Sequence, residues 1–250
     1  MPASWAVVAL DLVFPALCPV CDAVLGAGRR DPLCGGCWGE IARLGPPDCD
    51  VCGAPSPVRA DFERPPARGV RRACWTCTTR PPAYDYARSA AAYEGTLREA
   101  LHAFKFSGKR ALARPLGDLA IEQCRASLPE GIEALIPVPL AHERERERGF
   151  NQAALLAERL ARPLGIPVNT RWLGRVRATR PQSDLSAAER RANVRGAFRA
   201  SCGVAGRHVV VVDDVLTTGA TLGECARALR EAGARRIGVV TVARVLDAAV

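Results

Sequence analysis

The chain has 250 residues, of which 48% are hydrophobic and 24% are charged, enough for one ordinary domain and a small accessory module. A fully disordered chain is excluded, because that class combines few apolar residues with a strongly unbalanced charge. The formal net charge is +9 and rests mostly on arginine, since Lys105 and Lys109 are the only lysines. Such a charge indicates a polyanionic partner only weakly.

The N-terminal segment is apolar from Trp5 to Leu10, but it lacks a basic start and is interrupted by Asp11 and Pro15. It is too short to span a bilayer and does not resemble a signal peptide, so we expect a short helix over 5–14 that packs on the cysteines behind it. No later run reaches the ~18 apolar residues of a membrane span. We therefore expect a cytoplasmic protein without a membrane span, whose thiols stay reduced.

Eight of the eleven cysteines form four Cys-x-x-Cys pairs before residue 80: Cys18/Cys21, Cys34/Cys37, Cys49/Cys52 and Cys74/Cys77. Two such turns complete the tetrahedral S₄ set that zinc prefers. Taken in order, the pairs predict two structural zinc sites with no open position for water, although the spacing also allows an interleaved pairing. Redox dithiols or an iron–sulfur cluster are the alternatives. The remaining thiols have no partner at ligand spacing and are expected to be ordinary and half-buried: Cys124, Cys202 and Cys225.

The segment between Cys52 and Cys74 is rich in proline and arginine. It predicts a basic loop, which is either a solvated insertion or a contact for the phosphates of a single strand. Trp38 and Trp75 flank the cysteines, and we expect them in the local core rather than stacked on bases.

The clearest motif of the second half is the run Val209–Val212, followed by Asp213 and Asp214. Four consecutive valines predict a strand buried on both faces, and the acids then stand at its C-terminal end, where open α/β sheets bind their ligands. A hydroxyl-rich loop follows, and the capping-box spacing of Thr221 and Glu224 predicts a helix from Thr221 to about Gly233. A second strand is expected over 237–242, which completes a β-α-β unit.

This arrangement suits a phosphorylated sugar. Backbone N–H groups and threonine hydroxyls at a helix N-terminus can hold a phosphate monoester. Adjacent carboxylates suit vicinal sugar hydroxyls or a hydrated Mg²⁺. The sequence contains no G-x-x-x-x-G-K-[ST] loop, and this absence excludes a P-loop nucleotide-hydrolase site.

Val211 to Thr221 resembles the phosphoribosyl pyrophosphate (PRPP) signature of type I phosphoribosyltransferases. Ile136 to Leu140, Arg144 and the Arg148 to Gln152 motif RGFNQ resemble the ComF family. So do the segment Thr179 to Leu185 and the four leading Cys-x-x-Cys pairs, which are similar to the double zinc ribbon of many ComF members, GntX-like ones included.

The resemblance implies an α/β fold: a type I phosphoribosyltransferase-like parallel sheet flanked by helices, at residues 81–250, behind a double zinc ribbon at residues 1–80. It implies that Asp213 and Asp214 hold the ribose hydroxyls and are the catalytic candidates. The 5-phosphate would lie on the loop residues Thr217, Thr218, Gly219, Ala220 and Thr221. Arg144 and Arg148 would face the pyrophosphate, with Mg²⁺ bound alongside PRPP.

The family role implied is DNA uptake during natural transformation, with single-stranded DNA and DNA-uptake proteins as partners. Two alternatives stay open. The domain is an active phosphoribosyltransferase that acts on a nucleobase or amine, or the chain is a nucleic-acid-binding regulator that uses PRPP as a signal.

Further expectations concern single residues and the basic middle segment. Lys105 and Lys109 can reach the site or mark a surface helix end, and His102 has no partner for a metal. Phe150 is expected to be a packing anchor, and the basic 171–191 segment is expected to be partly mobile, as a lid over the site would need to be.

Overall fold

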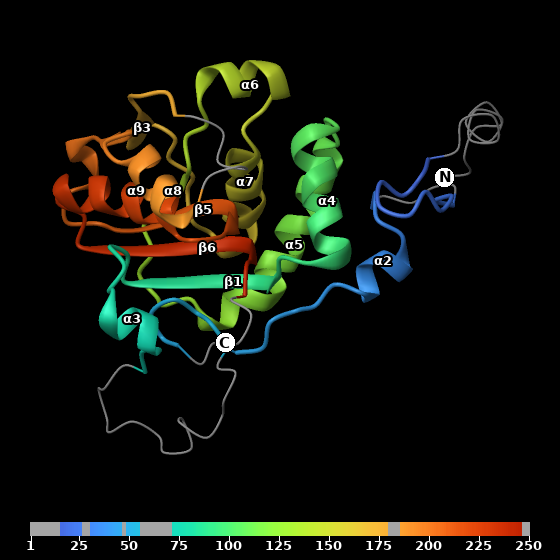
Figure 1. The fold of residues 1–250 in the computed structure, drawn as a ribbon, viewed down its shortest axis with the longest axis horizontal. Coiled ribbons are helices and arrows are strands. Elements are labelled where there is room, and N and C mark those ends of the chain that lie inside the picture. Colours follow the sequence, from blue (N-terminus) through green and yellow to red (C-terminus); the bar gives the residue numbers. More distant parts are fainter. Residues whose placement is uncertain (1–15, 27–30, 47–48, 56–71, 180–185, 247–250) are drawn as a thin grey trace.

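The computed structural model describes residues 16–26, 31–46, 49–55, 72–179 and 186–246. The β-strands are β1 (Tyr86–Ala92), β2 (Ala134–Pro137), β3 (Leu173–Arg175), β4 (Phe198–Ala200), β5 (His208–Leu216) and β6 (Arg236–Arg244). The α-helices are α2 (Gly35–Gly39), α3 (Trp75–Thr79), α4 (Gly95–Phe106), α5 (Ala113–Cys124), α6 (His142–Arg148), α7 (Gln152–Leu164), α8 (Ala187–Val194) and α9 (Ala220–Glu231) (Figure 1). Short 3₁₀ turns lie at Arg110–Leu112, Arg125–Ser127 and Cys202–Val204.

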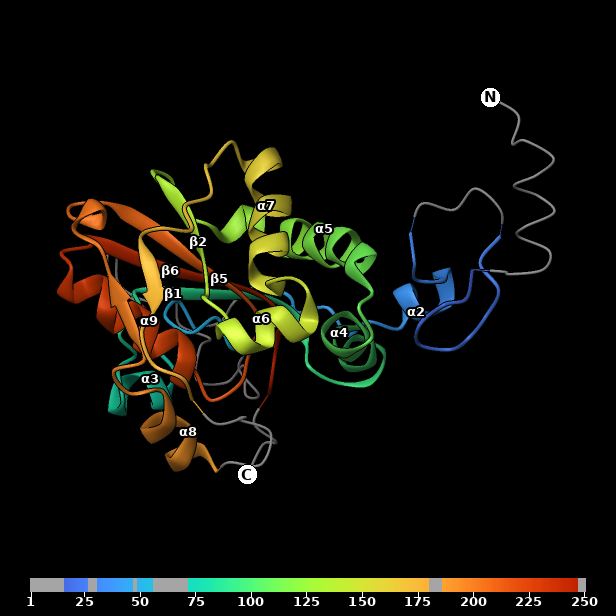
Figure 2. The same cartoon turned by 90° about the horizontal axis from the view of Figure 1, so that it is seen from above.

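The main sheet is parallel, with strand order β1-β6-β5-β2. The valine run lies in β5, and successive valines alternate between two cores. Val210 and Val212 pack with side chains of α4, α5 and α7, whereas Val209 and Val211 pack with side chains of α9. Figure 2 shows α5 and α7 on one side of the sheet and α9 on the other. The predicted fold class and the strand buried on both faces are thus confirmed.

A second, two-stranded antiparallel sheet pairs β3 with β4 beside α9. The chain between these strands contains α8, which begins in a capping box formed by Ser186 and Glu189. Within the described residues, no helix has the length and apolar content needed to cross a membrane.

The turn between α6 and α7 has the specific geometry that the RGFNQ motif suggests. Gly149 ends α6 with a φ of 77°, a left-handed conformation that glycine adopts without strain. Asn151 caps α7, because its side chain accepts from the N–H groups of Ala153 and Ala154. Phe150 between them is buried against Phe104, with ring centroids 5.5 Å apart, as expected of a packing anchor.

The predicted start of α9 is wrong in detail. The helix begins at Ala220, one residue earlier, and Gly219 at its N-cap has a φ of 72° and no side-chain cap. Glu224 does not reach back to the N-cap. Its carboxylate accepts from the backbone N–H of Gly196 instead, because the chain after α8 passes beside α9.

The cysteine-rich part packs along the outer edge of β1. Leu44 N–H donates to Ala90 O at 2.9 Å, Ala92 N–H donates to Ala42 O at 2.9 Å, and Ala87 N–H donates to Val51 O at 2.7 Å. These bonds satisfy backbone groups of a strand that would otherwise be an open edge. Figure 1 places α3 beneath β1 and α2 at the opposite end of the molecule, beyond α4.

Several smaller expectations have mixed outcomes. Trp38 is partly buried against the core, but Trp75 is 79% exposed and is not a core residue. Cys124 and Cys225 are fully buried rather than half-buried, because they lie on the buried faces of α5 and α9, and Cys202 is exposed. The N-terminal helix expected over 5–14 and most of the basic loop, 56–71, lie outside the described residues.

Candidate functional site

A cleft of about 1060 Å³ lies at the carboxyl edge of the parallel sheet. Its walls come from the ends of β1, β2 and β5, from α4 and α6, and from the chain around β3 and α8. Loops that follow parallel strands meet at one edge, so residues far apart in sequence share this cleft. Among the predicted site residues, those that line it are Arg144, Arg148, Asp213, Asp214, Thr217, Gly219, Ala220 and Thr221.

Asp213 and Asp214, the acid pair, project near the end of β5. Asp214 is 4% exposed and Asp213 is partly buried. Burial and then the charge of Asp214 raise the pKa of Asp213 well above its ordinary value. The Asp213 carboxylate accepts from the backbone N–H of Asp214 at 2.9 Å. A pair under this repulsion favours binding to hydroxyl donors or a cation.

The 217–221 loop joins β5 to the N-terminus of α9. Its left-handed Gly219 turns the chain so that the first N–H groups of a twelve-residue helix stand at the cleft. Thr217 is exposed and lines the cleft; Thr218 is exposed but lies outside the lining formed by the described residues. The helix end and the hydroxyls make a cradle suited to an anion.

The two predicted arginines come from α6 and line the same cleft as the acid pair. Burial lowers the pKa of the Arg148 guanidinium, and the charge of Asp214 acts against that shift. Arg148 Nη1 donates to Gln152 Oε1 at 2.5 Å, and the guanidinium lies 5.4 Å from the Phe106 ring centroid. Arg148 is therefore held in place, whereas Arg144 is a half-buried neighbour at the cleft wall.

Lys105 is the site residue that the sequence left undecided. Its ammonium forms an ion pair with Asp214, and both side chains are largely buried. Burial lowers the pKa of Lys105, but the Asp214 carboxylate more than offsets this, and the pKa is raised overall. The pair links α4 to β5. Lys109, the other candidate, is exposed and lies outside the cleft lining of the described chain.

The middle segment adds three more cleft residues: Arg175, Thr179 and Arg190. Burial lowers the pKa of Arg175, whose guanidinium donates to Thr179. Parts of the 171–191 segment therefore border the cleft, whereas its expected mobility stays a prediction and 180–185 lie outside the described residues. Thr179 begins a stretch that resembles the ComF family, whereas nothing in the sequence pattern separated Arg175 from the other arginines of the segment.

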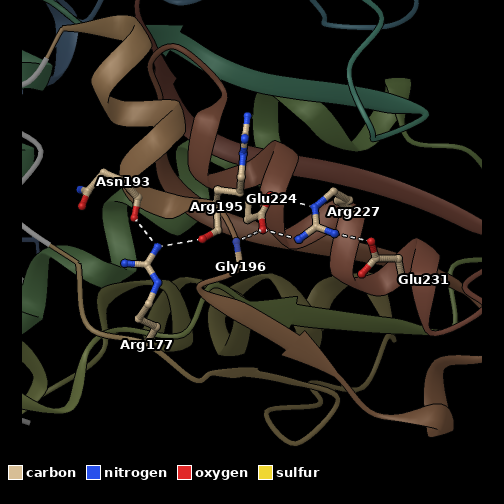
Figure 3. Close-up of polar contacts among 7 residues, drawn as sticks. All are labelled: Arg177, Asn193, Arg195, Gly196, Glu224, Arg227 and Glu231. Atoms are coloured by element: carbon tan, nitrogen blue, oxygen red, sulfur yellow. Dashed lines mark hydrogen bonds and ion pairs between the residues drawn. The ribbon is translucent and has the colours of Figure 1, made fainter.

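A polar network holds this segment against α9 (Figure 3). Arg177 donates to the carbonyls of Asn193 and Arg195 at 2.8 and 2.7 Å. Glu224, only 9% exposed, accepts from Gly196 N–H and pairs with Arg227 at 2.5 Å. Arg227 also pairs with Glu231. Arg177 thus ties the start of the segment to its end, and the end of the segment is bonded at Gly196 to α9, the helix that begins at the anion cradle.

The eight predicted cysteine ligands form two tetrads. The first cysteine tetrad is Cys18, Cys21, Cys34 and Cys37; the second is Cys49, Cys52, Cys74 and Cys77. Within each, all Sγ atoms lie within 4.8 Å of one another. The pairing is therefore consecutive rather than interleaved. Four thiolates around one point fit a structural zinc ion and leave no coordination position open to water.

The four thiols of the second tetrad interact strongly with one another. Hydrogen bonds from the Cys52 side chain and from the backbone N–H groups of Cys74 and Cys52 lower the pKa of Cys49 to about 4, against the opposing effect of burial. In turn, Cys49 and then burial raise the pKa of Cys52, and burial and then Cys49 raise the pKa of Cys77. A metal ion would bind all four as thiolates and so remove this mutual repulsion. The residues present therefore fit zinc, whose role there would be to hold the surrounding turns together.

Comparison with known proteins agrees with this architecture. A family model for the phosphoribosyl transferase domain matches residues 148–249, and one for the double zinc ribbon domain matches residues 9–78. Fold, cleft and cysteine tetrads thus define a phosphoribosyltransferase-type α/β domain joined to a double zinc ribbon.

Similarity to named proteins identifies the family within this class. The DNA utilization protein YhgH of Escherichia coli O157:H7 is 35% identical over 94% of this chain and all of that protein. Competence protein F of Haemophilus influenzae is 35% identical over 86% of this chain and 91% of that protein. Competence protein ComFC of Bacillus subtilis is 30% identical over 81% and 80%, respectively. The chain belongs to the ComF family.

Solved structures include a glutamine PRPP amidotransferase from B. subtilis, complexed with ADP and GMP. It is 26% identical, with a TM-score of 0.35, over 51% of this chain and 25% of that chain.

Proposed function

We propose that this chain binds PRPP or a related ribose phosphate and serves in DNA uptake and the handling of incoming single-stranded DNA. The observation that carries the first part is the convergence of the acid pair, the anion cradle and two arginines in one cleft. The names of the relatives, competence and DNA utilization proteins, support the second part.

In this proposal each group has a distinct task. N–H groups at the start of α9 and the hydroxyls of the 217–221 loop hold the 5-phosphate. Asp213 and Asp214 accept from the ribose hydroxyls, and Arg144 and Arg148 neutralise the pyrophosphate. Mg²⁺ bound with PRPP would supply further positive charge at the pyrophosphate.

The acid pair gives the sharpest test. With Asp213→Ala and Asp214→Ala combined, we expect calorimetric PRPP binding in the presence of MgCl₂ to be lost while zinc content stays at two per chain. Asp118→Asn is the matched control, since Asp118 pairs with Arg159 outside the cleft and should leave binding unchanged. Unchanged PRPP affinity in the double variant would refute the site.

The DNA part is tested separately. Neutralising phosphates releases counterions, so binding of a labelled single strand should weaken steeply as salt rises. Titration with and without PRPP also detects a regulator in which the two ligands are coupled. Absence of salt-dependent DNA binding by the intact chain would contradict this part of the proposal and leave the PRPP site standing.

A second candidate function is phosphoribosyl transfer to a nucleobase or amine. The buried charges of the cleft favour it, because Arg144, Arg148 and Lys105 could stabilise charge that develops on a leaving pyrophosphate. This candidate predicts pyrophosphate release that depends on an added acceptor. If pyrophosphate is released by slow hydrolysis alone and no added acceptor speeds its release, this candidate is contradicted.

A cytoplasmic location is also part of the proposal. Zinc-binding thiolates persist where thiols are kept reduced, which supports placing the chain in the cytoplasm. Cellular fractionation with an epitope-tagged chain tests it.

A further inference from the structure

Exposed arginines gather at the amino edge of the parallel sheet, the edge opposite the cleft. Arg207 directly precedes β5 and Arg235 directly precedes β6, and the N–H of Arg235 donates to the Arg207 carbonyl at 2.9 Å. Asp213 of the acid pair stands near the other end of β5, about 20 Å away at a rise of ~3.3 Å per residue. Both arginines lie outside the cleft lining of the described chain. They therefore have no task in the proposed ribose phosphate site.

The small β3–β4 sheet adds to this group. In its register, Leu173 lies opposite Ala200 and Gly174 lies opposite Arg199. Leu173 is buried in the core that includes α9. Side chains alternate between the two faces of a strand, so Trp172 and Arg199 stand on the other face. Figure 1 shows β3 and α9 on the side of the molecule away from α4.

Trp172 joins the sheet edge to the β3–β4 sheet. The Arg207 guanidinium lies 5.0 Å from the Trp172 ring centroid, and its Nε donates to Gly203 O at 3.1 Å. Arg171, the residue before Trp172, is exposed. These contacts combine the residues into one surface, which we call the arginine face: Arg171, Trp172, Arg199, Arg207 and Arg235.

The arginine face carries an excess of positive charge. Glu133 pairs with Arg207 at 2.9 Å. Within the described residues, Arg171, Arg199 and Arg235 are exposed and form no ion pair. Like charges that are grouped without counter-charges attract a polyanion.

The chemistry of the face fits a single-stranded nucleic acid. Guanidinium groups bind phosphate oxygens through paired N–H groups. Aromatic rings and guanidinium planes are also the surfaces on which unpaired bases stack, and Trp172 and Arg207 supply both. An acidic protein segment would use the charges but would leave these flat surfaces without a partner.

We propose that the arginine face binds single-stranded DNA through its phosphates, at the edge of the sheet opposite the PRPP cleft. The inference rests on the DNA part of the proposed function and gives that part a location. Because the two sites lie at opposite edges, the chain can hold a strand and PRPP at the same time.

The test compares two triple variants of the full-length zinc-loaded chain, titrated with labelled oligothymidine over a salt series. The face variant replaces three exposed arginines of the face: Arg171→Gln, Arg199→Gln and Arg235→Gln. The control variant removes as much charge at exposed positions elsewhere: Lys109→Gln, Arg146→Gln and Arg162→Gln.

The salt dependence gives the expected size of the effect. Each phosphate contact contributes about −0.7 to the slope of log K against log salt for a single strand. The face variant should therefore show a slope shallower by about 2 and bind at least about tenfold more weakly at low salt. The control variant should stay within about twofold of the original chain. PRPP affinity, measured by calorimetry with MgCl₂, should be the same in all three proteins.

The outcomes separate this proposal from the proposed function. If the original chain binds the strand and the face variant binds as tightly as the control variant, the arginine face is refuted while DNA handling stands. If the original chain does not bind the strand, both are refuted and the PRPP site is unaffected. Polyglutamate and phosphatidylserine vesicles are titrated in parallel. Binding of either one that depends on the three arginines, without binding of the strand, would overturn DNA as the occupant.

Discussion

At the scale of single residues, the cleft contains buried and mutually repelling charges that a bound ligand would stabilise. Asp213 is the clearest case, since burial and the neighbouring carboxylate both oppose its charge. Lys105 compensates Asp214 through the ion pair. Both effects predict measurable changes in stability.

For Asp213→Asn we expect a more stable protein at pH 7 and weaker PRPP binding. An acid with a raised folded-state pKa loses stability as pH rises above its unfolded pKa of about 3.9. The gain in the urea midpoint, measured without Mg²⁺, should therefore be largest at neutral pH and disappear near pH 3.5. A lower midpoint at pH 7 would contradict this account.

For Lys105→Met we expect the free energy of unfolding to fall by about 3 kcal/mol at pH 7. The reason is that removing one member of a buried pair leaves an uncompensated charge on Asp214. Urea unfolding of Lys105→Met, Asp214→Asn and the double variant measures this. The double variant should recover part of the loss, whereas strictly additive effects would show that the pair is not coupled.

The same residues show how far sequence reasoning reaches. The acid pair, Gly219 and the eight cysteine ligands stand in local patterns whose geometry follows from a strand, a turn or a Cys-x-x-Cys loop. Lys105 could not be placed in this way, because its partner lies on another element far along the chain. The functional roles of these residues remain predictions.

At the scale of elements, α9 has two structural roles. Its N-terminus forms the anion cradle, and its first turns anchor the segment that contains Arg175 and Arg190 through Glu224. Both α9 and β5 could be predicted from the sequence, because their hydrophobic pattern and the turn residues beside them are clear signals. The alternative use of Glu224 depended on the path of the chain after α8, which no local pattern specifies.

We expect Glu224→Ala to release the 186–196 segment from α9. The variant leaves the Gly196 N–H without its acceptor, at a cost of about 1–3 kcal/mol. Limited trypsin digestion should then cut faster at Arg190 and Arg191. Glu231→Ala is the matched control, since the Arg227–Glu231 pair is largely exposed and contributes little. Equal digestion rates of the two variants would contradict the anchoring role.

At the scale of the whole molecule, the second cysteine tetrad is joined to the sheet. Arg244 Nη1 at the end of β6 donates to Cys52 O at 2.6 Å. Burial and then the thiolates of Cys52 and Cys77 raise the pKa of Tyr84, so this tyrosine stands near the tetrad. A Cβ placed on Gly219 would lie 3.9 Å from the Tyr84 hydroxyl. Tyr84 therefore lies near both the second tetrad and Gly219 of the anion cradle.

We accordingly expect the two tetrads to differ in their effect on the cleft. Cys52→Ser and Cys21→Ser should each lower the zinc content from two to one per chain. Cys52→Ser should also lower the melting temperature further and weaken PRPP binding, whereas Cys21→Ser should leave PRPP affinity within about twofold. Zinc analysis, thermal melts and calorimetry measure these effects. Equal loss of PRPP binding in both variants would contradict the difference.

The hydrogen bonds along the outer edge of β1 also bear on how the chain is synthesised. In the finished sheet β1 pairs with β6, and the contact between Ser89 and Thr241 joins residues 152 apart. During translation β1 therefore emerges long before its partner strand exists. The cysteine segments that bond to its outer edge are already present at that time. Zinc uptake by the nascent chain would then give β1 a partner while the ribosome completes the rest of the sheet.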